Sequence, residues 1–396
     1  MILRAHAQAK ASKLLRRSPY VIVGGGAQGL TFALSLAFEG LPVVLFERSG
    51  VLGGQARSFR YADFVFDFGL HAFVTKTPRV ERFARRVLGR DFSSFYPRAA
   101  SHCGGPGMFE DASYWRTQSL HKRLYSLLPR AEGAEWSCMR VSRPPEVIYP
   151  RRGGFGAIFE RMGELLRENG GAVLLGTGLE PRRFAFRSRR LEAITLGGRR
   201  FPVRGCYWSA GRPFSAQAEP RNPGEASGPR DVLLLHHILA RGRAPQPYHW
   251  VRLPESRNPL LPPLAYYPSH FSRHNAPPGH YSIGTTTPIL TSIQGKRLGA
   301  LGQWVMADPK AFLKPTMNYL ADLGLLRSTD VIGAFSEAVA LPPAPRKPAR
   351  PGLRRFENFW DAADYPVHGA EESGVSVQME SAFAALDCAL AAPSAA

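Results

Sequence analysis

The sequence has few cysteines, and nothing in their spacing gives them a joint role. Cys103, Cys138, Cys206 and Cys388 are far apart in 396 residues and form no C-x-x-C pair. A small disulfide scaffold is therefore excluded, and neither a zinc site nor a redox dithiol is indicated. We expect no bound metal and a reducing compartment, which favours a cytoplasmic location.

Acidic residues are scarce compared with basic ones. The chain has 51 Lys+Arg against 31 Asp+Glu, a formal net charge of +20. Such a charge would suit nucleic acid, an anionic membrane surface or an acidic ligand. No recognised nucleic-acid-binding pattern accompanies it, and many of the arginines occur in scattered pairs. We therefore expect a solvated basic surface and no specific nucleic-acid partner, and we keep peripheral membrane contact as an alternative.

Only one long uncharged run is present, at residues 18–38. By hydropathy it could imitate a membrane span, but four glycines interrupt it where a strand should turn into a helix. The preceding residues 1–19 carry five basic side chains and no acid, which resembles a transit peptide or a basic amphipathic arm. Their apolar stripe is thin, so we expect a frayed basic extension before the first strand.

The composition is that of a folded chain with more than one domain. Apolar residues make up 44% and charged residues 21%, close to ordinary globular proteins. A length of 396 residues predicts two or three domains.

A complete strand, glycine turn, helix and second strand begin at Tyr20. The apolar run 20–23 suits a buried parallel strand, residues 30–39 have helical spacing, and 43–47 form the next strand. Between them, Gly24 permits the tight turn, Gly26 lets backbone approach a pyrophosphate, and Gly29 lets the helix pack closely. The register as a whole predicts a dinucleotide-binding Rossmann unit, with the phosphates at the helix N-terminus.

An acid at the end of the second strand completes this unit. Glu47 lies about twenty residues after the glycines, where a carboxylate can accept hydrogen bonds from ribose hydroxyls. The unit alone does not separate NAD from FAD.

The next residues resemble a flavoprotein signature. Residues 47–58, with Gly53 and Gly54, resemble the second signature of the flavin amine oxidase superfamily, which includes phytoene desaturases, protoporphyrinogen oxidases and UDP-galactopyranose mutases. The resemblance implies that FAD is the cofactor and that these paired glycines pass under its pyrophosphate. Arg57 either pairs with a phosphate or is an ordinary surface arginine.

Two further segments are similar to the same superfamily. Residues 66–76 resemble the segment beside the isoalloxazine ring, which makes His71 the candidate catalytic residue; a histidine satisfied in a domain interface is the alternative. Residues 358–364 resemble the closing signature, which implies that Asp364 meets the ribityl chain and pyrophosphate. The helix expected from about 375 to 390 would point its N-terminus at the flavin. The predicted cofactor contacts are Gly24, Gly26, Gln28, Gly29, Glu47, Arg48, Gly53, Gly54, Gln55, Arg57, Gly69 and Asp364.

The resemblance implies an α/β fold in which a Rossmann-type FAD-binding domain carries an inserted mixed α+β substrate domain. The segment 341–351 is rich in proline and basic residues, which indicates a stiff linker returning to the cofactor domain. The predicted boundaries are a basic extension at 1–19, the FAD-binding domain at 20–81, 149–211 and 351–396, and the substrate domain at 82–148 and 212–350.

The substrate region matches no specific motif, so its residues are weaker guides. Aromatic residues alternate with histidine and arginine there, which suits a sheet facing a flat or sugar-like ligand, although alternating core and surface residues explain the pattern equally well. His236 and His237 lie in an apolar run and are expected to be packed strand residues. The predicted substrate contacts are Tyr248, Trp250, Arg252, Tyr266 and Tyr267.

These features predict an FAD-dependent oxidoreductase in which a small-molecule substrate, apolar or cyclic, gives hydride to flavin N5. No second complete dinucleotide fingerprint is present, so oxygen or a quinone is the expected electron acceptor. One alternative is a non-redox enzyme resembling UDP-galactopyranose mutase, in which reduced flavin N5 attacks a sugar carbon. The other is a basic membrane-binding or nucleic-acid-binding flavoprotein without catalysis.

Overall fold

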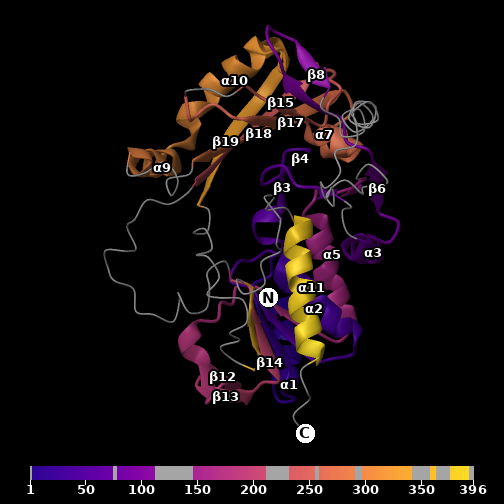
Figure 1. Ribbon diagram of the computed structural model, residues 1–396, viewed down its shortest axis with the longest axis vertical. Coiled ribbons are helices and arrows are strands. Elements are labelled where there is room, and N and C mark those ends of the chain that lie inside the picture. Colours follow the sequence, from indigo (N-terminus) through magenta and orange to yellow (C-terminus); the bar gives the residue numbers. More distant parts are fainter. Residues whose placement is uncertain are drawn as a thin grey trace, which may run out of the picture.

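Two sheets organise the molecule, one parallel with five strands and one mixed with seven (Figure 1). The computed structural model describes residues 2–74, 78–111, 146–210, 232–254, 258–289, 297–340, 357–362 and 375–391. Both sheets carry helices on a face, so the predicted α/β class is confirmed.

The parallel sheet gathers strands from three distant parts of the chain. Every residue of its β1, β2 and β14 strands is buried, which explains why these strands are continuous apolar runs in the sequence. In spatial order the strands are β10 (Ala172–Leu174), β2 (Val43–Phe46), β1 (Tyr20–Val23), β14 (Gly205–Trp208) and β20 (Phe359–Asp361).

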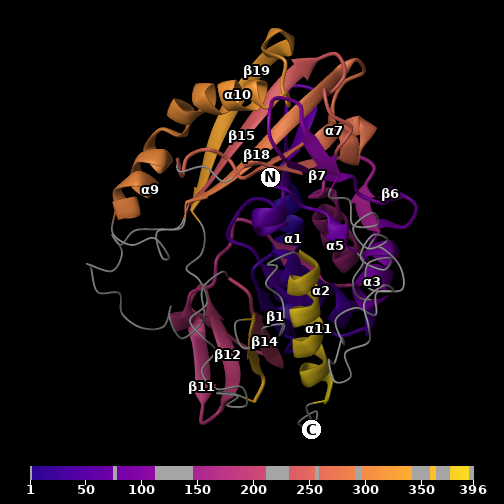
Figure 2. The same ribbon diagram turned by 45° about the horizontal axis from the view of Figure 1, so that its top comes forward.

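Helices cover one face of the parallel sheet. Figures 1 and 2 both show α11 lying beside α2, with the C-terminal end of α11 farthest from the seven-stranded sheet. Phe32 of α2 stacks on Tyr207 of β14 with ring centroids 4.2 Å apart, which ties the helix to the strand beneath it. The covering helices are α2 (Ala27–Phe38), α3 (Pro78–Leu88), α5 (Ala157–Glu168) and α11 (Val375–Ala391).

The opposite face is covered by the N-terminal helix α1 (Ile2–Leu15) and a small antiparallel sheet. The expectation of a frayed extension at residues 1–19 is wrong. Ala11, Leu14 and Leu15 are buried against β2 and β10, because this apolar edge covers a face that would otherwise be open to solvent. The small sheet consists of β11 (Phe184–Arg187), β12 (Arg190–Leu196) and β13 (Arg199–Pro202).

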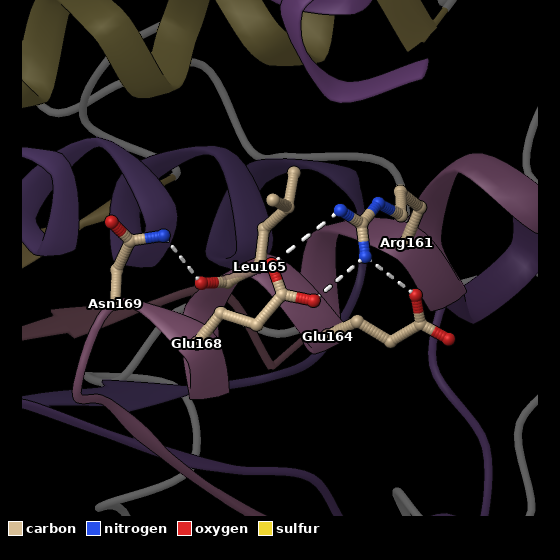
Figure 3. A network of polar contacts seen from close by, with 5 residues as sticks. All are labelled: Arg161, Glu164, Leu165, Glu168 and Asn169. Atoms are coloured by element: carbon tan, nitrogen blue, oxygen red, sulfur yellow. Dashed lines mark hydrogen bonds and ion pairs between the residues drawn. The ribbon is translucent and has the colours of Figure 1, made fainter. Parts of the chain in front are cut away.

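The exposed side of α5 carries a compact network of polar side chains (Figure 3). Arg161 Nη1 donates to Glu164 and to Glu168, at 2.9 Å in each case. At the end of the helix, Asn169 Nδ2 donates to the Leu165 carbonyl at 2.8 Å. Exposed pairs of this kind contribute about 0.3–0.5 kcal/mol each, so burial of the other face of α5 holds the helix in place.

The seven-stranded sheet lies at the top of the molecule in the view of Figure 1. Helices α9 (Arg297–Ala307) and α10 (Leu313–Asp322) lie on its outer face. Its strands, in spatial order, are β19 (Val331–Ala340), β15 (Val232–Arg241), β18 (His280–Ile289), β17 (Leu264–Tyr266), β16 (Trp250–Arg252), β7 (Ala99–His102) and β8 (Phe109–Asp111).

Short strands and turns lie between the two large sheets. The hairpin β3 (Ser58–Tyr61) and β4 (Phe64–Asp67) packs under the seven-stranded sheet through Phe64 and Phe66. A second small sheet contains β5 (Phe73–Val74), β9 (Val147–Pro150) and β6 (Phe92–Phe95). The remaining short elements are η1 (Gly54–Ala56), η3 (Pro181–Arg183), α7 (Pro268–Phe271), η5 (Arg273–Asn275), η6 (Pro309–Phe312) and η7 (Ser328–Asp330).

Within the ranges that the structure describes, no helix is both long and apolar enough to span a membrane. The uncharged run 18–38 is divided between β1 and α2, as its glycines predicted. The expected linker at 341–351 lies outside the described residues.

Candidate functional site

The candidate cofactor site begins at the turn between β1 and α2. Gly24 has a φ of +105°, and a Cβ built on it would lie 2.7 Å from the Ser209 carbonyl oxygen. A Cβ on Gly29 would lie 1.9 Å from the Gly24 carbonyl oxygen, so only glycine lets the helix begin this close to the strand. At Gly26, by contrast, a Cβ would meet no heavy atom within 4 Å. The turn is therefore crowded at Gly24 and Gly29, whereas the space that a side chain at Gly26 would enter is open. We call this space the opening above Gly26.

The open position lies at the N-terminus of α2. Gly26 is the N-cap residue, and no side chain caps this end of the helix. The first backbone N–H groups of a helix lack intrahelical partners and carry a partial positive charge. An anionic group can therefore bind at this end, which is the arrangement that holds pyrophosphate in Rossmann domains.

Glu47 closes the other side of the turn from the end of β2. Its Oε2 accepts from the Gly25 N–H at 2.6 Å and its Oε1 accepts from the Ser49 N–H at 2.7 Å. The side chain is only partly buried. Because each carboxylate oxygen has more than one lone pair, Glu47 keeps capacity to accept from ribose hydroxyls.

The second glycine segment lies directly against the first. The Gly53 N–H donates to the Gly25 carbonyl at 2.8 Å, and Gly26 and Gly53 form an isolated parallel bridge. A Cβ on Gly54 would lie 3.4 Å from the Gly26 Cα, so the exposed Gly54 borders the open position. The structure therefore brings together two motifs that are separate in the sequence.

Two other predicted contacts point away from this opening. Gln28 Nε2 donates to Ser381 Oγ on α11 at 3.2 Å, which links the two neighbouring helices. Arg48 is exposed, and a Cβ built on Gly178 would lie 3.4 Å from its Cγ. Asp364, the predicted contact of the ribityl chain, lies outside the described residues.

The loop after β4 places His71 beside the hairpin. His71 Nε2 lies 2.9 Å from the Phe68 carbonyl oxygen and 3.1 Å from the Gln55 carbonyl oxygen. Since carbonyl oxygens only accept, Nε2 must carry the hydrogen in a neutral ring, which leaves Nδ1 as the acceptor. A Cβ on Gly69, whose φ is +99°, would lie 3.8 Å from His71 Nε2. His71 is thus oriented by backbone, with one ring nitrogen left to accept a hydrogen bond.

Arg57 directly precedes β3 and lies beside Phe68, in the loop that leads to His71. Its guanidinium is 4.4 Å from the centroid of the Phe68 ring. Burial raises the pKa of the Glu337 carboxyl. The positive charge of Arg57 lowers the same pKa by a smaller amount. Arg57 therefore faces the space between the hairpin and β19, where cation–π contact and charge both hold it.

The buried carboxyl of Asp67, at the end of β4, links residues from distant parts of the chain. Asp67 Oδ1 accepts from the Phe155 N–H at 2.9 Å and from the Ser58 hydroxyl at 2.5 Å, and Oδ2 accepts from the Tyr149 hydroxyl at 2.7 Å. Tyr149 in turn accepts from Asn275 Nδ2 at 3.1 Å. Burial raises the pKa of Asp67, and these hydrogen bonds lower it by smaller amounts.

This network was not anticipated from the sequence. Asp67 lies in the segment 66–76, whose resemblance assigns no role to its carboxyl. The available signal is a lone acid among phenylalanines in residues 64–68, which predicts a buried carboxyl that needs several donors.

Strand register shows which side chains of the seven-stranded sheet face the cofactor domain. Leu235 of β15 pairs with Thr286 of β18 and with Glu337 of β19, and paired residues share a face. A Cβ on Gly69 would lie 3.9 Å from Thr286 Oγ1 and from Leu233 Cδ2, which fixes this face as the inner one. Thr286 Oγ1 and Glu337 Oε2 are buried and find no hydrogen-bond partner in the described chain.

Three of the five predicted substrate residues lie on that inner face. Trp250 pairs with Tyr266, which pairs with Gly284; Arg252 is two residues farther along β16 and is exposed. The Tyr266 hydroxyl donates to the Asp67 carbonyl at 3.4 Å. A Cβ on Gly284 would come within 2.2 Å of the Tyr266 ring, so this glycine makes room for the tyrosine.

The other two predicted substrate residues lie elsewhere. Tyr267 is buried on the outer face and its hydroxyl donates to the Leu325 carbonyl at 2.8 Å. Tyr248 packs against the same outer core, and its carbonyl accepts from His270 Nδ1 at 2.6 Å. The structure therefore does not bring Tyr248 and Tyr267 together with the inner-face residues.

His236 and His237 are fully buried strand residues, as expected. Burial lowers the pKa of His236 to about 4, and His236 Nδ1 lies 2.7 Å from Ser336 Oγ. His237 is enclosed by the rings of Phe59, Phe66 and Phe335, and burial lowers its pKa to about 3. Both rings are neutral at neutral pH. Among the described residues, no group of three His, Cys, Asp or Glu side chains could hold a metal ion.

Comparison with known proteins identifies the first domain. Residues 22–87 match the family of NAD(P)-binding Rossmann-like domains. The chain is also 34% identical over 84 residues to an uncharacterised protein from the nifH2 3′ region of Methanothermococcus thermolithotrophicus, covering 20% of this chain and 81% of that protein. It belongs to the same family as this relative.

Similar solved structures cover nearly the whole chain. A reduced UDP-galactopyranose mutase superposes with a TM-score of 0.62 and 16% identity, covering 94% of each chain. A putative protoporphyrinogen oxidase from Exiguobacterium sp. 255-15 gives 0.59 and 13%, covering 93% of this chain and 98% of that one. Putrescine oxidase bound to putrescine gives 0.56 and 11%, covering 94% and 99%. At these identities the likeness concerns the fold.

Proposed function

We propose that this chain, which has the fold of the FAD amine oxidase-like superfamily, binds one FAD and acts as a flavin-dependent oxidoreductase. The observation that carries the proposal is the contact between the two glycine segments, in which the Gly53 N–H donates to the Gly25 carbonyl. The first segment suits any dinucleotide, whereas the second resembles a signature of the flavin amine oxidase superfamily. Their contact supports FAD over NAD.

The residues present fit an FAD molecule. The opening above Gly26 leaves room for a pyrophosphate beside the unpaired N–H groups of α2. Glu47 would hold the adenosine ribose through its remaining lone pairs, and Gly54 would border the flavin side of the pyrophosphate. The redox chemistry itself would be supplied by the bound flavin, which accepts hydride at N5.

The chain would position a substrate between the His71 loop and the inner face of the seven-stranded sheet. On β15 and β19, Leu233, Leu235 and Val339 give this face an apolar lining beside the polar groups of Thr286 and Glu337, whereas Tyr266 and Arg252 lie on neighbouring strands of the same face. Such a lining favours a mainly apolar substrate that presents one hydrogen-bond donor. His71 Nδ1 is the basic atom that could accept a proton there, because Nε2 is bound to backbone carbonyls. Oxygen or a quinone would reoxidise the flavin.

The experiment is anaerobic stopped-flow absorbance of the oxidised protein mixed with apolar polyenes, porphyrinogens and amines. Bleaching of the flavin by one of these substrates, followed by recovery with oxygen or a quinone, is the expected result. His71→Gln should slow the bleaching by about a hundredfold, within the usual range for removing a general base.

A mutase function is the second candidate, because a reduced UDP-galactopyranose mutase is among the similar structures. Arg252, Trp250 and Tyr266 on the inner face could contact a sugar nucleotide. The acid Glu337 on this face disfavours a diphosphate, since like charges repel. Turnover of a sugar nucleotide by dithionite-reduced protein, with no substrate bleaching the oxidised protein, would replace the oxidoreductase proposal.

A further inference from the structure

A concave site lies in the predicted substrate region, apart from the glycine turn and the His71 loop. It is a cavity of about 690 Å³ between the segment after β15, helix α7 and the loop that leads into β18. Such a volume is within the range of small-molecule sites. Pro245, Pro247, Pro277 and Pro278 form much of its wall, and their fixed φ angles limit how far the wall can move. The cavity is therefore largely preformed.

The charged groups of this cavity are all basic. Arg243 and Arg273 line it and are exposed, and neither has an acidic partner among the residues that the structure describes. No Asp or Glu is part of the lining. Asp330 is an acid next to this lining, since a Cβ built on Gly242 would lie 3.9 Å from its Oδ2.

Three histidines line the same cavity: His249 Nδ1 accepts from the Arg98 N–H at 3.0 Å, whereas His270 and His280 each contact a carbonyl oxygen through Nδ1. His270 Nδ1 lies 2.6 Å from the Tyr248 carbonyl oxygen, and His280 Nδ1 lies 3.0 Å from the Pro278 carbonyl oxygen. Since a carbonyl only accepts, Nδ1 carries the hydrogen in each neutral ring and Nε2 is an acceptor. The hydroxyl of Ser269 is buried in the same wall and has no hydrogen-bond partner in the described chain.

We propose that this cavity binds the phosphate group of an anionic ligand, at a site separate from the flavin. Arg243 and Arg273 supply the planar, multiply donating groups that pair with phosphate oxygens. A phosphate that retains one proton can donate it to a histidine Nε2 while its other oxygens accept from the guanidinium groups. An anion lacking a proton satisfies only half of this arrangement, which makes phosphate the best match.

The test is calorimetric titration of FAD-saturated protein with pyrophosphate. Saturating FAD keeps the glycine turn filled, and the flavin spectrum of the same samples reports separately on the cofactor site. We expect saturable binding of one pyrophosphate. The double variant Arg243→Gln/Arg273→Gln should bind it at least about tenfold more weakly, because two charge-assisted pairs are lost.

The matched control is Arg16→Gln/Arg17→Gln, which removes the same charge from exposed positions at the end of α1. It should bind pyrophosphate as the unaltered protein does. A parallel sedimentation with vesicles of phosphatidylcholine and phosphatidic acid, whose headgroup is a phosphomonoester, distinguishes a lipid headgroup from a free phosphate. Loss of vesicle binding in the first double variant alone would assign the site to a headgroup. The proposal is overturned if neither probe binds saturably, or if both double variants bind equally.

Discussion

The backbone N–H of Gly25 donates to Glu47 Oε2 at 2.6 Å, which joins the end of β1 to the end of β2. The same carboxylate also accepts from the Ser49 N–H. Glu47 therefore both shapes the glycine turn and borders the position above Gly26. Its two roles can be separated by measuring folding and cofactor affinity on the same variants.

Glu47→Ala is expected to weaken FAD binding by about tenfold to a hundredfold, because charge-assisted hydrogen bonds to ribose are worth about 1.5–3 kcal/mol. The measurement is the FAD dissociation constant from flavin fluorescence quenching. Glu39→Ala is the control, since it removes an exposed acid from the same βαβ unit. Equal dissociation constants for the Glu47→Ala and unaltered proteins would place the adenosine elsewhere.

Gly26→Val is expected to abolish FAD binding while leaving the chain folded. A Cβ at this position meets nothing within 4 Å, so the valine side chain would project into the open position and occupy the space needed by the pyrophosphate. Flavin content and circular dichroism of the purified variant check both parts. Gly50→Val, which also meets no atom within 4 Å, should keep its flavin. Full flavin occupancy in Gly26→Val would mean that the turn is only structural.

Tyr149→Phe is expected to lower the free energy of unfolding by about 1–3 kcal/mol, because it leaves Asp67 Oδ2 and Asn275 without their buried partner. Urea denaturation measures the change. Tyr266→Phe is the control, since its hydroxyl contacts the backbone of Asp67 and Gly69 and not the Asp67 carboxyl, so its loss should matter less. An equal loss in both variants would show that the Asp67 network is not the cause.

His237→Leu is expected to make stability less sensitive to acid. Burial depresses the folded-state pKa of His237 to about 3, so its neutral ring favours the folded state above pH 6.5 and this contribution is lost as the pH falls toward 3. Each such histidine adds a slope of about 1.4 kcal/mol per pH unit between these limits.

The check is the free energy of unfolding at pH 6.5 and pH 4.5 for His237→Leu and for the exposed control His274→Leu. Only His237→Leu should flatten the dependence. A slope unchanged by His237→Leu would mean that His237 is not buried as a neutral ring.

The cofactor domain could be predicted from the sequence because its signals are local. The strand at Tyr20–Val23, the glycine turn and the second strand each follow from residues close together. Helix α1 was missed because, among residues 7–15 whose burial is described, the buried ones are Ala11, Leu14 and Leu15. This stripe is too thin to distinguish a docked helix from a frayed one.

The substrate side could be predicted only in part, because its arrangement depends on which face of a sheet is turned inward. Alternation along β17 requires Tyr266 and the following Tyr267 to face opposite ways, yet nothing local shows which one faces the cofactor domain. For the same reason, the sequence does not show that Glu337 and Thr286 face the cofactor domain. The partners of Asp67 are 82 and 88 residues away at Tyr149 and Phe155, beyond the reach of any local pattern.

The most direct test of the account is to denature the purified protein and identify what it releases by chromatography against FAD and FMN standards. The contact of the two glycine segments, the opening above Gly26 and the carboxylate of Glu47 predict a yellow protein that releases one FAD per chain. A colourless protein that also fails to take up added FAD would contradict the central claim.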